Sequence, residues 1–73
     1  MIVLDAEREA LFVADWFKPG QVTMLRKGAG GKWVRGTLLD DPKLKIQSMC
    51  VLDANRLSLF DANSSALLIY EFA

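Results

Sequence analysis

The sequence predicts a mainly β fold: a small antiparallel meander or a partly open barrel of about 5–7 short strands. Turn-forming clusters such as Lys18-Pro19-Gly20 and Asp53-Ala54-Asn55 recur at intervals of about ten residues. Between these clusters, apolar and polar residues mostly alternate, which is typical of strands that bury one face. A chain of 73 residues is short for more than one core, so we expect a single small domain over residues 1–73.

The alternating segments define the expected strands. We expect strands near residues 21–27, 32–39, 44–52, 56–60 and 66–72. In the third segment the alternation places Cys50 on the same face as Ile46. We therefore expect the Cys50 thiol to be buried and structural.

The C-terminal segment is apolar on both faces. Leu67 and Ile69 point to one side, and Leu68, Tyr70 and Phe72 point to the other. A strand that faces water on one side should alternate more cleanly. This segment is therefore either a central strand covered on both faces or part of a surface for a partner.

The N-terminal segment allows two interpretations. Asp5 can cap a helix over about residues 6–17, which is rich in residues that favour helices. That helix would pack on an antiparallel sheet, and the fold class would be α+β. Alternation favours a strand instead, with Ala10, Phe12 and Ala14 on one side.

Two segments of the chain are similar to each other. Residues 3–12 (VLDAEREALF) and residues 51–60 (VLDANRLSLF) share seven of ten positions. The second copy is typical of a hairpin, because Asp and Asn side chains satisfy the amides of a tight turn. Duplication and chance are both open explanations of so short a match.

The glycine-rich loop in KGAGGKW, residues 27–33, invites comparison with phosphate-binding loops. A phosphate-binding loop of the Walker type needs a glycine five residues before its Gly-Lys pair and Ser or Thr after it. Gly31-Lys32 has Arg26 and Trp33 at those positions. Because a strand pattern follows the loop, we expect a β-hairpin whose glycines supply positive φ angles.

The composition argues against catalysis and against metal chemistry. The chain has no histidine and a single cysteine, Cys50, so it lacks His-based triads and the multi-cysteine zinc patterns. Neighbouring carboxylates such as Asp40 and Asp41 fall in a turn pattern and match no calcium loop. We expect no catalytic residues, no metal ligands and no cofactor.

The N-terminal residues and the apolar runs predict the location. The start MIVLDAERE lacks the basic region of a signal peptide, and the apolar runs are far too short to span a membrane. We expect no membrane partner and a cytoplasmic protein, in a bacterial cytoplasm or a host cell interior.

Charge is balanced overall but segregated along the chain. Nine basic and nine acidic residues give a net charge of zero. Residues 18–35 nevertheless contain five bases and no acid. Nucleic-acid binders usually carry an overall basic excess, so the basic segment fits either edge protection, an acidic protein partner or, with less support, nucleic acid.

These observations favour a non-catalytic regulator that binds a partner protein and modulates it, docking through strand edges and aromatic anchors. A small nucleic-acid-binding β-module that uses residues 26–35 is the first alternative, and a homo-oligomeric structural subunit is the second. The candidate partner-binding residues are Trp16, Phe17, Arg26, Lys27, Lys32, Trp33, Arg35, Tyr70 and Phe72.

The general profile of the chain is similar to that of the very small regulators that bacteriophages make against host enzymes, including those that bind bacterial RNA polymerase. The likeness covers size, missing catalytic groups and surplus apolar side chains. It implies inhibition or regulation of host machinery such as transcription, and it assigns no role to any residue.

Overall fold

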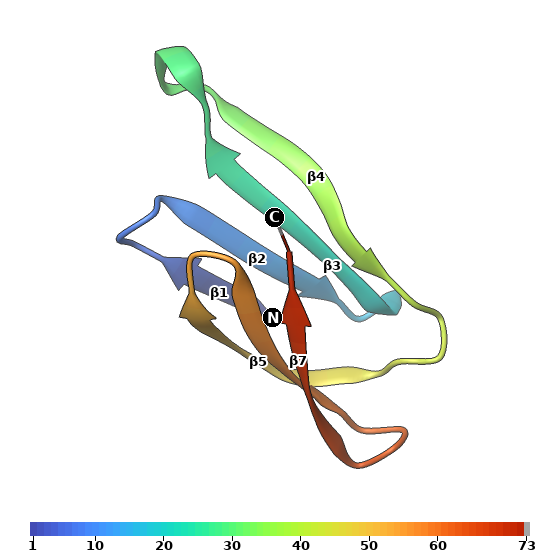
Figure 1. Ribbon diagram of the computed structural model, residues 1–73. Helices are drawn as coiled ribbons and strands as arrows, with labels where there is room; N and C mark the ends of the chain where they lie inside the picture. Colours follow the sequence, from blue (N-terminus) through green and yellow to red (C-terminus); the bar gives the residue numbers. More distant parts are fainter. Residues whose placement is uncertain (73) are drawn as a thin grey trace.

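The computed structural model describes residues 1–72, which form seven antiparallel strands and no α-helix (Figure 1). The strands are β1 (Ile2–Asp5), β2 (Ala10–Asp15), β3 (Lys18–Lys27), β4 (Trp33–Asp40), β5 (Ile46–Asp53), β6 (Arg56–Asp61) and β7 (Ala66–Glu71). They form two open meanders, β1-β2-β3-β4 and β5-β6-β7. The predicted mainly β fold of short antiparallel strands is confirmed.

One hydrophobic core lies between the two sheets. Its buried side chains are Ala10, Phe12, Ala14 and Val22 from the first sheet and Ile46, Met49, Leu57 and Leu59 from the second. Phe12 also contacts Phe72, with ring centroids 5.9 Å apart. Burying a side chain such as Leu57 stabilises the fold by roughly 1.5–3 kcal/mol, so these few residues supply most of the apolar stabilisation.

The N-terminal helix proposed as an alternative is wrong. Residues 6–9 form a turn, and β2 follows with Phe12 facing the core. The carboxylate of Asp5 still accepts the Arg8 N–H, at 3.3 Å, as a helix cap would. A strand forms because the alternation of Ala10, Phe12 and Ala14 buries one face fully. A helix over residues 6–17 would have needed Phe17 on its buried face, but Phe17 is 93% exposed.

One expectation and one of two open alternatives about position in the sheets are also wrong. Cys50 is exposed, because an irregularity between Ile46 and Ser48 shifts the alternation of β5 by one residue. Of the two alternatives for the C-terminal segment, the covered central strand is wrong: β7 is an edge strand, and Leu67 and Ile69 are exposed on the uncovered outer face of its sheet. In addition, the presumed turn at Lys18-Pro19-Gly20 is the beginning of β3.

The glycine-rich loop turns the chain between β3 and β4, as predicted. Gly30 and Gly31 have φ angles of 76° and 78°, a region that side chains with a Cβ rarely adopt. The Gly28 N–H donates to the Lys32 carbonyl oxygen at 2.7 Å and closes the hairpin. This hairpin is the long projecting end of the molecule in Figure 1.

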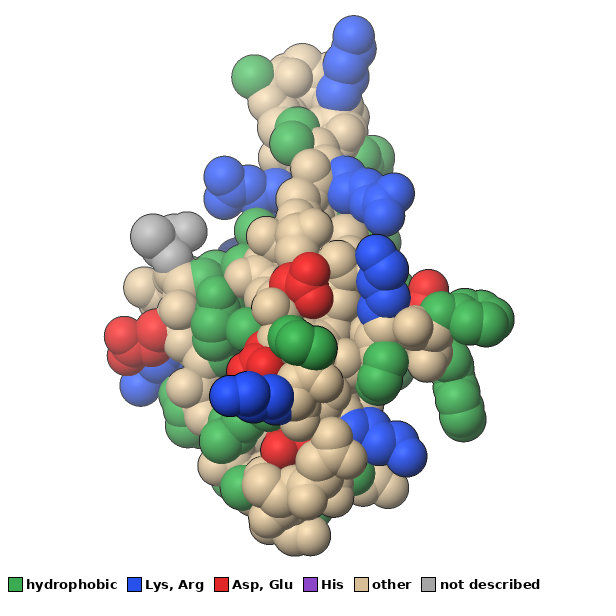
Figure 2. Space-filling view, turned by 90° about the vertical axis from the view of Figure 1, so that its right-hand side faces the viewer, with side chains coloured by type: hydrophobic (Ala, Val, Ile, Leu, Met, Phe, Trp, Pro, Cys, Tyr) green, Lys and Arg blue, Asp and Glu red, His purple; other side chains and the backbone are tan. Residues whose placement is uncertain are grey.

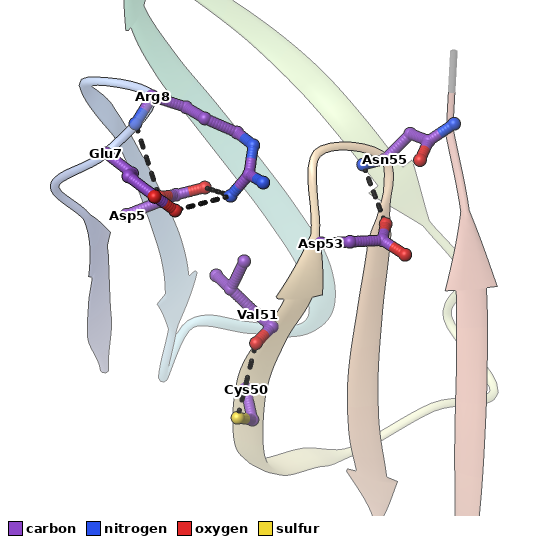
Figure 3. A network of polar contacts seen from close by, with 7 residues as sticks. All are labelled: Asp5, Glu7, Arg8, Cys50, Val51, Asp53 and Asn55. Atoms are coloured by element: carbon purple, nitrogen blue, oxygen red, sulfur yellow. Dashed lines mark hydrogen bonds and ion pairs between the residues drawn. The ribbon is translucent and has the colours of Figure 1, made fainter.

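The two similar sequence segments each form a hairpin with an Asp–Arg pair at its turn. Arg8 Nη1 lies 3.0 Å from Asp5 Oδ2, and Arg56 donates through Nε to Asp53 Oδ2 at 2.7 Å. Figure 3 shows Arg8 with its two acidic partners and the Asn55 N–H on Asp53.

The two hairpins differ at the turn and beyond it: four residues separate Asp5 from its partner Ala10, whereas two separate Asp53 from its partner Arg56. Phe12 is buried in the core, whereas Phe60, its counterpart in sequence, is only half-buried. An irregularity between Val51 and Asp53 in the second hairpin shifts the register by one residue. A shift of one residue sends every following side chain to the opposite face.

Candidate protein-binding surfaces

The first candidate surface is the basic hairpin, residues 26–35. The cross-strand partners are Lys27 with Trp33, Arg26 with Val34 and Leu25 with Arg35. Because neighbouring residues of a strand point to opposite faces, Lys27, Trp33 and Arg35 share one face and Arg26 lies on the other. Each of the three paired cations, Arg26, Lys27 and Arg35, faces an apolar partner across the strands.

The charges of the basic hairpin are largely uncompensated. Lys27 Nζ lies 3.2 Å from Glu9 Oε2. Among residues 1–72, no carboxylate lies within ion-pair distance of Arg26, Lys32 or Arg35. On the face shown in Figure 2, blue side chains surround the narrow upper end, and red ones appear only below it. This end therefore presents a positive field.

The second candidate surface is the aromatic turn, Trp16-Phe17, which joins β2 to β3. Trp16 is 91% exposed and Phe17 is 93% exposed. The Asp15 carboxylate accepts the Phe17 N–H at 3.1 Å and so fixes the turn. Both rings are therefore exposed to solvent, and the Asp15 side chain fixes the backbone that carries them.

A cleft opens beside the aromatic turn, at the end of the core between the two sheets. It has a volume of about 540 Å³. Its lining residues are Met1, Ala14, Asp15, Trp16, Pro19, Lys45, Ile46, Gln47 and Ala62. Since most of these side chains are apolar and Trp16 forms one wall, the cleft and the aromatic turn make one continuous surface.

The predicted residues do not form one site. β3 has ten residues, so the aromatic turn and the tip of the basic hairpin lie about 30 Å apart at opposite ends of that strand. Tyr70 and Phe72 lie elsewhere, half-buried against the core. The Tyr70 hydroxyl donates to the Leu38 carbonyl oxygen at 2.7 Å. The structure thus gives these two residues contacts within the fold.

Sequence reasoning missed the apolar outer face of the first sheet. Ile2 and Leu4 are 69% and 62% exposed. Their cross-strand partners Val13 and Leu11 continue this face into β2. The alternation of these residues was visible in the sequence, but their pairing was not.

Within residues 1–72, no group of three or more Cys, Asp or Glu residues is arranged to hold a metal ion. The same residues contain no helix long and apolar enough to cross a membrane.

The structure is that of a small, mainly β protein. The sequence matches no protein-family model, and comparisons with curated proteins and with solved structures found no match.

Proposed function

We propose that this protein is a non-catalytic regulator that binds another protein and modulates it. The exposure of Trp16 and Phe17 carries this proposal. Aromatic side chains are favoured anchors in protein interfaces. Burying each ring against a partner would contribute roughly 1.5–3 kcal/mol.

The basic hairpin supports an acidic partner surface. Three of its cations have no carboxylate within ion-pair distance among residues 1–72. Opposite charge on the partner would accelerate association and orient the two molecules. In this proposal the hairpin guides the approach, and the aromatic turn supplies the stabilising contacts.

Affinity purification of a partner from cell extract, with variants in parallel, tests the proposal. Trp16→Ser combined with Phe17→Ser should abolish recovery of a stoichiometric protein partner. Leu67→Ser, which removes an apolar side chain of 69% exposure from the other sheet, should leave recovery unchanged. Equal recovery with all three proteins would contradict the proposal.

A second pair of variants tests whether the charges of the basic hairpin guide association. Lys32→Glu with Arg35→Glu should slow association at low salt, whereas Lys43→Glu, an exposed lysine outside the hairpin, should have a small effect. If both variants behave alike, the basic hairpin does not guide binding.

Nucleic-acid binding is a second candidate, because Trp33, half-exposed, shares a face with Lys27 and Arg35. Stacking on an aromatic ring between cations is how many single-strand binders work. This candidate predicts that an oligonucleotide quenches Trp fluorescence and that the affinity falls steeply with salt. A flat titration at low salt would remove it.

A homo-oligomeric subunit is a third candidate, supported by the uncovered apolar outer faces. The accessible surface is 5068 Å², against about 4,500 Å² for a compact monomer of this length. Light scattering tests this candidate, and a monomer mass over a wide concentration range would discard it.

A further inference from the structure

The free edge of β4 differs from the other sheet edges of the molecule. Among residues 1–72, β3 is the only strand that pairs with β4. All five residues from Trp33 to Thr37 are exposed. β1 has only four residues, and β5 is interrupted by two register irregularities; both features protect an edge against pairing. β7 has an unbroken register over six residues, but it contains no base and ends at Glu71. β4 has neither protection in this stretch.

The backbone of β4 presents a regular set of free hydrogen-bonding groups at this edge. The bond from the Gly28 N–H to the Lys32 carbonyl shows that Lys32 faces β3 with its backbone groups. The β3–β4 register then continues without a break to Thr37. In an antiparallel pair, successive residues alternate between facing the partner strand and facing away. The N–H and C=O groups of Trp33, Arg35 and Thr37 therefore point outward from the sheet.

The side chains along this edge select the chemistry of an incoming strand. Arg35 is the only charged side chain between Trp33 and Thr37, and among the edge strands of residues 1–72 only β4 contains a base. On the opposite face, Val34 is 56% exposed, and no atom lies within 4 Å of the position a Cβ would take at Gly36. The Arg35 face thus suits carboxylates, and the opposite face, which also carries Arg26 across from Val34, has open space over Gly36 for apolar side chains.

We infer that the β4 edge binds an extended segment of the partner protein in which acidic and apolar residues alternate, and that this segment adds to the sheet as a fifth strand. Its carboxylates lie beside Arg35, and its apolar side chains fill the open space over Gly36. The inference rests on the proposed function, because it specifies the partner's segment. A second copy is disfavoured, since it would bring the cations of two basic hairpins together.

Selection of peptides from a random display library on the immobilised full-length protein tests the inference. The enriched peptides should alternate Asp or Glu with aliphatic residues. One enriched peptide is then synthesised and titrated against Arg35→Ala, which removes the charge, and against Arg35→Pro, which also removes an outward N–H. We expect Arg35→Ala to weaken binding about threefold and Arg35→Pro about tenfold further.

A second pair keeps the result interpretable if Arg35→Pro fails to fold. Thr37→Pro removes another outward N–H without changing any charge, and Thr37→Ala is its matched control. Circular dichroism confirms the fold of each variant. Binding about tenfold weaker with either proline variant than with its alanine counterpart supports the inference.

The remaining outcomes overturn it. Peptides without excess acid, or no enriched peptide, would exclude an acidic strand at this edge. Peptides that bind both proline variants normally but lose binding with Trp16→Ser and Phe17→Ser would overturn the inference and leave the proposed function standing. A dimer that Arg35→Pro dissociates would assign the edge to a second copy. Binding of an oligonucleotide alone would overturn both proposals.

Discussion

Tyr70 Oη donates a hydrogen bond of 2.7 Å to the Leu38 carbonyl oxygen, and this bond joins β7 of the second sheet to β4 of the first. The β3–β4 register shifts between Val22 and Thr23, which pair with Leu39 and Thr37. Leu38 is therefore the extra residue of that irregularity and has no partner in β3. Its carbonyl is free to accept a bond from the opposite sheet.

We expect Tyr70→Phe to lower the free energy of unfolding by about 1 kcal/mol, because it leaves the half-buried Leu38 carbonyl without its partner. Urea denaturation measures the loss. Ser58→Ala is a suitable control, since the Ser58 hydroxyl makes only an exposed bond of 3.4 Å to the Cys50 carbonyl. Equal losses in the two variants would show that the bond between the sheets contributes no more to the free energy of unfolding than an exposed hydrogen bond does.

Asp61 connects the β4–β5 loop to the β6–β7 turn. It is 3% exposed, and its carboxylate accepts the Lys45 N–H at 2.8 Å and the Ser64 hydroxyl at 2.6 Å. Asp61→Ala leaves these donors unsatisfied and should lower the Tm by roughly 5–10 °C. Asp41→Ala removes a carboxylate that accepts one exposed N–H and should have a smaller effect. If both variants melt at the same temperature, Asp61 does not organise these loops.

Stability should fall in acid because two carboxylates are better stabilised in the folded state. The Arg56 side chain, and then the Asn55 N–H, hold the pKa of Asp53 below its ordinary value of 3.8. The Lys45 N–H, and then the Ser64 hydroxyl, lower the pKa of Asp61 in the same way. A carboxylate whose pKa is lower in the folded than in the unfolded state stabilises the fold fully above about pH 4. This stabilisation is lost as the pH falls through the pKa of the folded state.

Urea midpoints measured between pH 7 and pH 2 check this expectation. The fall below pH 4 should be smaller in the variant that carries both Asp53→Asn and Asp61→Asn. A wild-type midpoint that stays constant or rises in acid would contradict the assignment.

The same substitution at two strand glycines should have opposite effects. A Cβ at Gly20 would lie 1.8 Å from the Asp41 carbonyl oxygen, a backbone atom, whereas a Cβ at Gly36 meets nothing within 4 Å. Gly20→Ala should therefore destabilise the fold by about 1–3 kcal/mol. Gly36→Ala should be neutral or stabilise it by about 0.5–1 kcal/mol. Tolerance of alanine at Gly20 would show that the chain does not pass so closely there.

The parts of the fold that depend on local pattern could be predicted from the sequence. The glycines of the β3–β4 turn and the alternation of Ala10, Phe12 and Ala14 each define a local structure without any distant contact. The exposed Cys50 could not be foreseen, because a single irregularity in β5 reversed the alternation on which its predicted burial depended.

The candidate surfaces were predictable as segments but not as an arrangement. Nothing local indicates that Trp16 and Arg35 stand at opposite ends of one sheet, or that Tyr70 is bonded to Leu38. These relations follow from strand order and from packing between the sheets, which involve residues far apart in the chain. The free β4 edge likewise follows only from the observed pairing.

Site-specific photo-cross-linking from position 17, in the cells that make the protein, tests the central claim most directly. With a photoreactive amino acid in place of Phe17, we expect a covalent product with one protein. The same group at Ala54, an exposed turn residue of the other sheet, should give no such product. A product with nucleic acid only, an identical product from both positions, or no product at position 17 would contradict binding of a protein through the aromatic turn.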